Sequence, residues 1–474
     1  MDAAVIARNR FGLGARPGEL DRDQPPARDW LLEQVQAGLS PTPPNMATLP
    51  DSRAAAAKFE DWALARARER RAGKSGAEAD AAEQFRKSFQ QDLLAEIGAR
   101  ADQQVRTETP FLERLVLFWS NHFALSADKP QVTGLVGPFE REVIRPRLLG
   151  SFADLLIAAE QHPAMLRFLD NANSFGPGSE FVRDPPRRLR RLASNNGQPL
   201  KLGLNENLAR EILELHTLGV NGGYTQADVV ELAKGISGWT VQTRLLRGGD
   251  AVGPHGFVWF AEAHEPGDRE LLGRRYEAGG REQGEAMLRE LARHPATARF
   301  LATKLARHFV ADQPPASLVA RLEQRYRASG GELGAVYRAL IESPEAWQPE
   351  PRKLKRPEEF LVSALRATGL PAPREGKAWV ASLSLLGQAP MRPGSPAGWP
   401  DEASAWIGPD SLWKRMQIAE QISEKLPART EPLALARAAL GPWLQADTIE
   451  AMQRAESTAQ AVAILLSSPE FQWR

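Results

Sequence analysis

The chain has 474 residues, of which 42% are hydrophobic and 25% are charged, an ordinary balance for a globular protein with a large core. Its 60 basic residues nearly cancel its 59 acidic ones, so the net charge of +1 provides no overall field to attract nucleic acid or an anionic membrane. The absence of cysteine excludes disulfides, thiolate zinc sites, iron–sulfur clusters and covalent haem attachment through C-x-x-C-H.

Two further patterns bear on the location of the protein. No segment approaches the roughly 18 consecutive apolar residues that a transmembrane helix needs, so we expect no membrane span. Residues 1–16 lack the basic start, apolar stretch and cleavage site of an export signal, and also a twin-arginine motif. The sequence as it stands therefore predicts a cytoplasmic protein. A periplasmic location is the alternative if a signal has been removed or if the chain is exported with a partner.

The N-terminal part of the chain predicts mostly helix. After a glycine-rich segment at 11–18, residues 52–104 are rich in Ala, Arg, Glu and Gln, all strong helix formers. We expect two long solvated helices here, interrupted at 73–76 and packed on the side of a larger body. The fold class expected for 1–474 is mainly α: one multi-helix globular module with a small β-hairpin insertion and this long N-terminal helical pair.

The segment from Phe111 to Trp119 is almost entirely apolar, which indicates a buried helix. His122 follows this segment closely and is therefore expected inside the protein. Two interpretations stay open for His122: a core histidine with a hydrogen-bond partner, or a metal ligand or acid–base group. His162 and His294 each precede a proline, a pattern that predicts the start of a helix.

A segment of Gly, Pro, Ser and Arg at 172–203 predicts a loop, which is long for a compact domain. It holds the only dense basic cluster of the sequence, formed by Arg187, Arg188, Arg190 and Arg191. We interpret this cluster either as a solvated loop or as a contact for an anion or an acidic partner.

The densest polar chemistry lies on a helix predicted from Asn205 to Leu218. At 100° per residue, one arc of this helix collects three carboxylates and a guanidinium, while Leu and Ile residues fill the opposite side. These four side chains are Glu206, Arg210, Glu211 and Glu214. If the arc faces water, each of its i,i+4 ion pairs stabilises the helix by only about 0.2–0.5 kcal/mol. If it faces a polar cavity, Arg210 keeps its neighbouring carboxylates ionised, and Glu211 is a candidate base or hard-metal ligand.

After Trp239 the pattern changes from helical to β. Residues 240–246 and 257–263 contain β-formers and are separated by glycines, which predicts one hairpin insert at 240–263 as the only sheet. His264 follows this hairpin in a predicted loop, where functional residues are frequent, so it is a further candidate ligand. Trp399 and Trp406 lie in a Pro/Gly-rich loop, and we interpret them as packing anchors or as the wall of a pocket.

Several catalytic classes find no support in the sequence. The chain has no Gly-x-Ser-x-Gly elbow, no dinucleotide-binding glycine pattern and no kinase signature. It also lacks the Glu-x-x-His pairs of di-iron bundles and the His-Glu-x-x-His motif of zinc proteases. The cofactor hypothesis that stays open is a divalent metal held by His122, Glu211 and His264.

Several motifs together resemble bacterial domain-of-unknown-function family 1800. The most specific is the run NENLAREILELHTLGV at 205–220. The other matching segments are 11–14, 118–123, 224–229, 238–240 and 398–406. They cover nearly the whole chain in the expected order. The family often has His-Asp where this chain has His264-Glu265, a departure that retains the carboxylate.

The resemblance implies little about activity, because the family is named for its unknown function. It implies a gene neighbourhood with family 1501, whose members resemble the alkaline phosphatase and sulfatase superfamily. Residues 299–345 are distantly similar to helical domains of planctomycete proteins associated with cytochromes. Because the chain has no cysteine, covalent haem is not carried over.

Two functional hypotheses follow. The first is an enzyme or a binder of a small polar ligand, with a cleft lined by the 205–218 helix. Its candidate site residues are Glu206, Arg210, Glu211, Glu214 and His122, and its most specific form is hydrolysis assisted by a divalent metal. The second hypothesis is a non-catalytic helical partner or scaffold for a family 1501 protein. The sequence indicates neither a substrate nor an oligomeric state.

Overall fold

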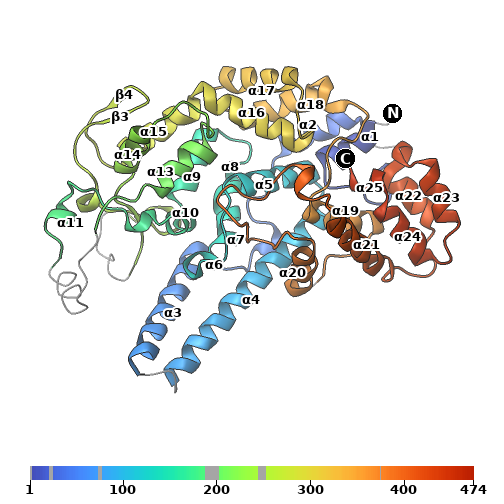
Figure 1. Cartoon of the computed structure of the whole chain (residues 1–474), viewed down its shortest axis with the longest axis horizontal. Coiled ribbons are helices and arrows are strands. Elements are labelled where there is room, and N and C mark those ends of the chain that lie inside the picture. The colour runs from blue at the N-terminus through green and yellow to red at the C-terminus, as the bar shows by residue number, and fades with distance from the viewer. Residues whose placement is uncertain (1–2, 21–24, 73–76, 187–201, 244–251, 374) are drawn as a thin grey trace. The chain divides into compact units, whose positions relative to one another are not determined.

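The structure is a computed structural model that describes residues 3–20, 25–72, 77–186, 202–243, 252–373 and 375–474. These residues are mainly α-helical, with two small two-stranded sheets (Figure 1). The chain divides into two compact units, each built from segments that lie far apart in the sequence. Unit 1 comprises 1–49, 93–121 and 301–474, and unit 2 comprises 50–92 and 122–300. No helix within the described ranges is long and apolar enough to cross a membrane.

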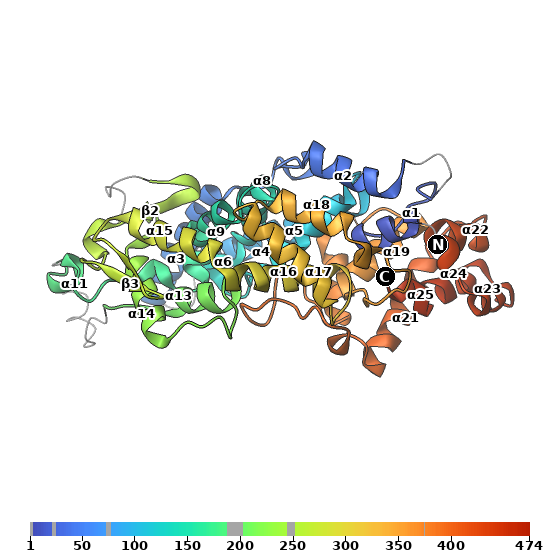
Figure 2. The same cartoon turned by 90° about the horizontal axis from the view of Figure 1, so that it is seen from above.

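Unit 1 is built from helices around an aromatic core. Trp119 is fully buried, and its Nε1 donates a hydrogen bond of 2.6 Å to the hydroxyl of Tyr337. In Figure 2, α21 to α24 lie together, and α24 packs against each of the other three. The main helices of the unit are α1 (Ala3–Ile6), η1 (Ala7–Phe11), α2 (Ala27–Ala37), α4 (Ala77–Arg106) from residue 93, α5 (Pro110–His122) up to residue 121, α16 (Pro295–Phe309) from residue 301, α17 (Ala316–Ala328), α18 (Leu333–Glu342), α19 (Pro357–Thr368), α20 (Gly376–Leu385), α21 (Pro409–Ser423), α22 (Pro432–Leu440), α23 (Ala446–Gln453), α24 (Thr458–Ser467) and α25 (Pro469–Gln472).

Unit 2 combines helices with the two sheets. Its core includes the contact of α9 with α15 and that of α13 with α14, where Leu156, Leu208 and Leu232 are fully buried. The helices of this unit are α3 (Ser52–Ala72), the part of α4 before residue 93, α6 (Pro130–Thr133), α7 (Val136–Phe139), η3 (Glu140–Ile144), α8 (Arg145–Arg147), α9 (Phe152–Gln161), α10 (Pro163–Phe168), η4 (Asn171–Asn173), α11 (Glu180–Arg183), α13 (Asn207–Glu211), η5 (Ile212–His216), α14 (Gln226–Gly235), η6 (Pro254–Gly256), η7 (Ala261–Ala263), α15 (Arg281–Arg293) and the first residues of α16.

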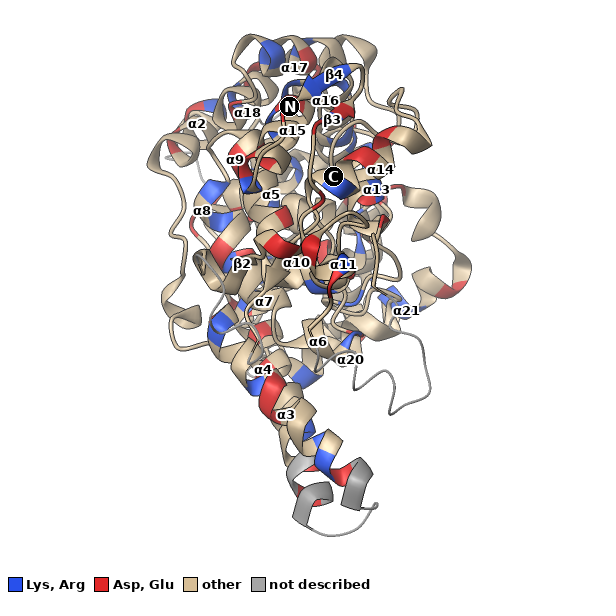
Figure 3. Cartoon of the chain, turned by 90° about the vertical axis from the view of Figure 1, so that its left-hand side faces the viewer, with Lys and Arg blue, Asp and Glu red and all other residues tan. Residues whose placement is uncertain are grey.

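The long helical pair predicted at 52–104 is present. Helices α3 and α4 lie side by side (Figures 1 and 3), and Lys58 of α3 forms an ion pair with Asp92 of α4. Acidic and basic residues are interspersed along both helices in Figure 3, as expected for solvated helices. The interruption expected at 73–76 lies outside the described residues.

The β-structure differs from the prediction of a single hairpin. Strands β1 (Trp239–Val241) and β2 (Phe257–Trp259) pair antiparallel, with Thr240 opposite Val258. They are shorter than the predicted strands, and the glycine turn between them falls among residues that the structure does not describe. A second sheet, formed by β3 (Arg269–Leu271) and β4 (Arg274–Tyr276), overturns the expectation of only one. It was missed because three-residue, arginine-rich strands carry almost no period-two signal, although Gly273 marks their turn with φ of 73°.

Several local signals are confirmed. The Thr225-x-x-Asp228 spacing is typical of a capping box, and these two residues form one reciprocally at the start of α14, which packs next to α13. The side chains of His162 and His294 accept hydrogen bonds from the backbone amides of Ala164 and Ala296, so both histidines begin helices. The basic cluster of Arg187, Arg188, Arg190 and Arg191 lies outside the described residues.

Candidate functional site

The segment predicted as one regular helix is an α-helix followed by a π-helix. Helix α13 covers Asn207–Glu211, and the wider π turn η5 covers Ile212–His216. The hydroxyl of Thr217 donates to the carbonyl of Ile212 at 2.6 Å and closes this turn. The wider turn shifts the angular positions expected at 100° per residue. Thr217, which a regular helix would place on the polar arc with Glu206 and Arg210, is fully buried. Single π turns are rare in proteins and frequent at functional sites.

The polar arc at the start of this segment is half-exposed. Arg210 pairs with Glu206 at 3.1 Å and with Glu214 at 3.8 Å, and these side chains are 38%, 36% and 29% exposed respectively. Gln226 of α14 joins them by donating to Glu206 at 2.7 Å and accepting from Arg210 at 2.9 Å. Burial and a hydrogen bond with Glu214 raise the pKa of Tyr224 to about 12, so its phenol stays protonated near neutral pH. Three of the predicted site residues thus form one polar cluster that neither lies fully open nor is fully enclosed.

A buried group of polar side chains lies at the other end of the same segment. His216 is 1% exposed, and its Nδ1 lies 2.8 Å from Oε1 of Glu160, a fully buried carboxylate on α9. His122 is also buried, and its Nε2 donates to the backbone carbonyl of His216 at 3.1 Å. Within the described ranges, Oε2 of Glu160 and Nε2 of His216 have no hydrogen-bond partner. Unsatisfied atoms of this kind are uncommon in protein interiors and point to a water, an ion or a ligand.

Glu211 interacts electrostatically with both the half-exposed cluster and the buried group of polar side chains. It is half-buried at the end of α13, and burial raises the pKa of its carboxyl group above the usual range. The negative charges of Glu214 and Glu160 act in the same direction, whereas His216 and Arg210 oppose the shift. Such a carboxyl group keeps its proton to a higher pH than free glutamate and exchanges it more readily near neutrality.

His264, the third candidate metal ligand, has other partners. Its Nδ1 donates to the backbone carbonyl of Ser237 at 2.9 Å, and its ring lies 4.9 Å from that of Trp259. The neighbouring Glu265 accepts from the amide of Gly178 at 2.5 Å and so joins two loops. Among the residues that the structure describes, no group of three or more histidine, aspartate or glutamate side chains is placed to hold a metal ion.

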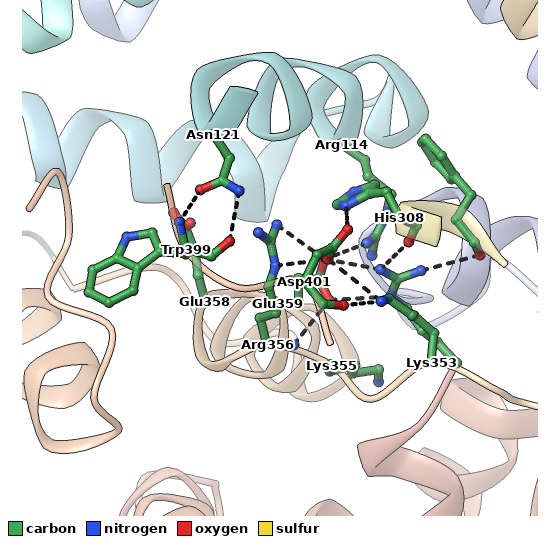
Figure 4. A network of polar contacts seen from close by, with 12 residues as sticks. Arg114, Asn121, His308, Lys353, Lys355, Arg356, Glu358, Glu359, Trp399 and Asp401 are labelled. Carbon is green, nitrogen blue, oxygen red and sulfur yellow. Dashed lines mark hydrogen bonds and ion pairs between the residues drawn. The ribbon is translucent and has the colours of Figure 1, made fainter. Parts of the chain in front are cut away.

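Two of the other matching segments, 118–123 through its Asn121 and 398–406, meet in unit 1. The side-chain amide of Asn121 donates to the carbonyl of Trp399 at 3.0 Å and accepts from its amide at 2.7 Å (Figure 4). A Cβ added at Gly398 would lie 2.4 Å from the carbonyl oxygen of Asn121, so only glycine fits this approach. Trp406 is buried and donates from Nε1 to the carbonyl of Pro400 at 3.0 Å. Trp406 therefore packs inside the protein, whereas the hydrogen bonds that hold Trp399 are made by its backbone.

This loop leads into a buried network of charges (Figure 4). Asp401 accepts from Nδ1 of His308 at 3.1 Å, and burial lowers the pKa of His308 to about 4. Glu359 is 2% exposed and is held by Arg114 at 2.8 Å and Arg474 at 3.1 Å. The network is a structural ion cluster, because its two central carboxylates are each matched by buried cations or by a histidine.

Sequence reasoning missed a second carboxylate–histidine group in unit 2. Glu142, on the π turn η3, has His255 Nδ1 at 2.9 Å and His162 Nε2 at 3.0 Å from its Oε2. The hydroxyl and the amide of Ser52 also donate to this carboxylate, at 2.6 and 3.0 Å. No local pattern reveals the group, because its members come from four separate segments. The proline after His162 predicted only its role at the start of a helix.

Comparison with models of protein families identifies the family of the chain. The model of the family described as "Protein of unknown function (DUF1800)" matches residues 6–473. The chain belongs to this family. Comparisons of this DUF1800 protein with curated proteins and with solved structures gave no match. The match spans both units, so the family assignment covers the 205–218 segment of unit 2 as well as the Trp399 loop of unit 1.

Proposed function

We propose that unit 2 binds a small polar ligand beside the 205–218 segment and acts on it by acid–base chemistry. In this proposal Glu211 is the group that exchanges a proton, and hydrolysis is the reaction class. The observation that carries the proposal is the buried Glu160–His216 pair, with one unsatisfied oxygen and one unsatisfied nitrogen, because His216 ends the π turn that directly follows Glu211. Hydrolysis assisted by a divalent metal is the more specific form of the hypothesis, but the roles of the side chains do not require a metal.

The roles of the side chains follow from their positions. As a carboxylate, Glu211 accepts a proton from an attacking water, and as a carboxylic acid it returns that proton to the leaving group. His216 bears its Nδ1 proton toward Glu160, so its Nε2 lone pair is available for a hydrogen bond from a water or ligand. Arg210 and Gln226 present nitrogen donors at the half-exposed end of the segment, where they would orient a polar ligand.

Replacement of Glu211 tests the proposal. The assay is hydrolysis of p-nitrophenyl acetate and p-nitrophenyl phosphate by the full chain, together with native mass spectrometry for a co-purifying ligand. We expect Glu211→Gln to lower turnover at least tenfold, or to abolish retention of the ligand, with an unchanged circular dichroism spectrum. The matched control is Glu290→Gln, a half-exposed carboxylate of unit 2 in an ion pair with Arg274. Equal, large losses of stability in Glu206→Gln, Arg210→Met and Glu211→Gln would instead identify a structural ion network.

The pH dependence of stability provides a second test of Glu211. Because its pKa is raised in the folded protein, the stability that its protonated form contributes is fully present below the pKa of unfolded glutamate. This stability is lost as the pH rises through the folded pKa. The Glu211→Gln variant should therefore lose less stability than the wild type over that pH range, measured by urea unfolding at a series of pH values. Parallel curves for the two proteins would show that Glu211 has no unusual proton affinity.

A second proposal, a non-catalytic partner of a family 1501 protein, is favoured by one observation in unit 1. Leu412, Trp413 and Met416 lie on one side of α21 and are 39%, 59% and 49% exposed. Exposed apolar side chains that gather in one place often mark a protein-binding surface. Trp413→Ser should then abolish co-purification with a family 1501 protein, whereas Val220→Ser, at an exposed apolar position of unit 2, should not. Retention of the complex by Trp413→Ser would contradict this proposal.

A further inference from the structure

A cavity of about 490 Å³ lies within unit 2, away from the 205–218 segment. Its walls come from α8, from the whole length of α9, from the η6 turn and from α15. The polar side chains in its lining are Arg147, Ser151, Asp154, Gln161, His162, His255 and Arg289. The volume falls within the range of about 300–1,000 Å³ that is typical of small-molecule sites.

Among the residues that line the cavity, His255 is the one positioned for proton transfer. Its side chain is 33% exposed, and its Nδ1 lies 2.9 Å from Oε2 of Glu142. Hydrogen bonds from His162, His255 and Ser52 outweigh the effect of burial and lower the pKa of Glu142 strongly, so this carboxylate is ionised. An ionised carboxylate only accepts hydrogen bonds, and therefore Nδ1 of His255 carries the proton.

The other histidine of the group has a fixed role. Nδ1 of His162 accepts the amide of Ala164 at 3.1 Å, so its proton lies on Nε2 and is donated to Glu142. Burial lowers the pKa of His162, which keeps this ring neutral. His162 therefore orients Glu142, while His255 has an Nε2 lone pair available to a molecule in the cavity. This arrangement of carboxylate and imidazole is the one that enzymes use to prepare a histidine for proton transfer.

The charges in the lining indicate what the cavity binds. Arg147 donates from Nη1 to the backbone carbonyl of Glu142 at 2.8 Å, and within the described ranges it forms no ion pair with a carboxylate. Burial lowers the pKa of Arg147, and the negative charge of Asp154, which also lines the cavity, offsets this effect only in part. The guanidinium is therefore held partly away from water beside a single carboxylate with which it forms no ion pair within the described residues. Arg289 adds a second cation, paired with Glu285 at 2.9 Å. A planar guanidinium that forms no ion pair with a carboxylate of its own protein can bind the carboxylate or phosphate oxygens of a ligand.

We propose that this cavity binds a small ligand with a phosphate or carboxylate group, which Arg147 holds while His255 Nε2 exchanges a proton with the ligand. The site is separate from the one around Glu211 and shares no residue with it. The proposal stands on the lining of the cavity, on the Glu142–His255 contact and on the guanidinium of Arg147, which forms no direct ion pair within the described residues.

The experiment uses the full chain with inorganic phosphate and with acetate as separate probes, at constant ionic strength. Binding is followed by the ring signals of ¹⁵N-labelled histidine, and the His255 signal is assigned by its loss in His255→Asn. We expect a saturable shift of the His255 signal with at least one probe. A tighter response to phosphate identifies a phosphorylated ligand, whereas a tighter response to acetate identifies a carboxylate. Saturation with neither probe would overturn the proposal.

Arginine variants show whether the response belongs to the cavity. Arg147→Gln should weaken probe binding at least tenfold, and Arg289→Gln by a smaller factor. Arg293→Gln is the matched control, because Arg293 is an exposed arginine of the same helix, α15, and does not line the cavity. If Arg147→Gln fails to fold, the comparison of Arg289→Gln with Arg293→Gln decides. Equal weakening by a cavity variant and by the control would indicate a diffuse charge effect and overturn the proposal.

Discussion

His255 occupies a left-handed backbone conformation, with φ of 59° and ψ of 5°, that residues other than Gly, Asn, Asp and His rarely adopt. We predict that His255→Asn and His255→Val differ in stability, although both lose the hydrogen bond to Glu142. The valine variant should have a free energy of unfolding lower by about 1–2 kcal/mol, because a β-branched side chain disfavours left-handed backbone. Urea unfolding of both variants measures this difference. Equal stabilities would mean that the turn relaxes at no cost.

His308 is expected to make the protein sensitive to acid. Its pKa is about 4 in the folded protein, below the usual value of 6.5, because the ring is buried. Stability from the neutral ring is therefore present above about pH 6.5 and is lost as the pH falls toward 4. The full effect is about 3 kcal/mol in the free energy of unfolding. His308→Gln should flatten the dependence of stability on pH across this window, and an unchanged slope would contradict the prediction.

At the scale of elements, the capping box of α14 allows a direct test. Thr225 accepts the amide of Asp228, and Asp228 accepts both the amide and the hydroxyl of Thr225. Because this cap starts the helix that packs on α13, Thr225→Ala should destabilise the protein by about 1 kcal/mol. Thr225→Ser keeps the hydroxyl and should retain most of the stability. Thermal unfolding distinguishes the two variants, and similar losses in both would assign the effect to the lost methyl group.

The regular elements were largely predictable from the sequence, because their signals are local. A nearly all-apolar segment predicted the helix of Trp119, and the spacing of Thr225 and Asp228 is typical of the capping box that they form. The π turn after Glu211 could not be predicted, since its i→i+5 hydrogen bonds leave no recognisable spacing of residue types. The same limit applies to the three-residue strands of the second sheet.

The candidate sites were predictable only where their residues share one element. Glu206, Arg210 and Glu214 lie along one stretch of sequence, and the structure brings them together with Gln226. Glu160 was not predicted, because nothing near it in the sequence relates it to His216. The Glu142–His255 contact was not predicted for the same reason, because tertiary packing joins residues that no periodicity of the sequence relates.

At the scale of the whole molecule, the order of segments has a consequence for synthesis on the ribosome. The chain alternates between the units four times, and unit 2 is complete once residue 300 has emerged. Unit 1 must wait for its last segment, which runs from 301 to 474, so its first 49 residues leave the ribosome long before their partners in that segment exist. Chaperones that shield apolar surface during translation should therefore engage this early segment, and unit 2 should resist proteases on stalled nascent chains before unit 1 does.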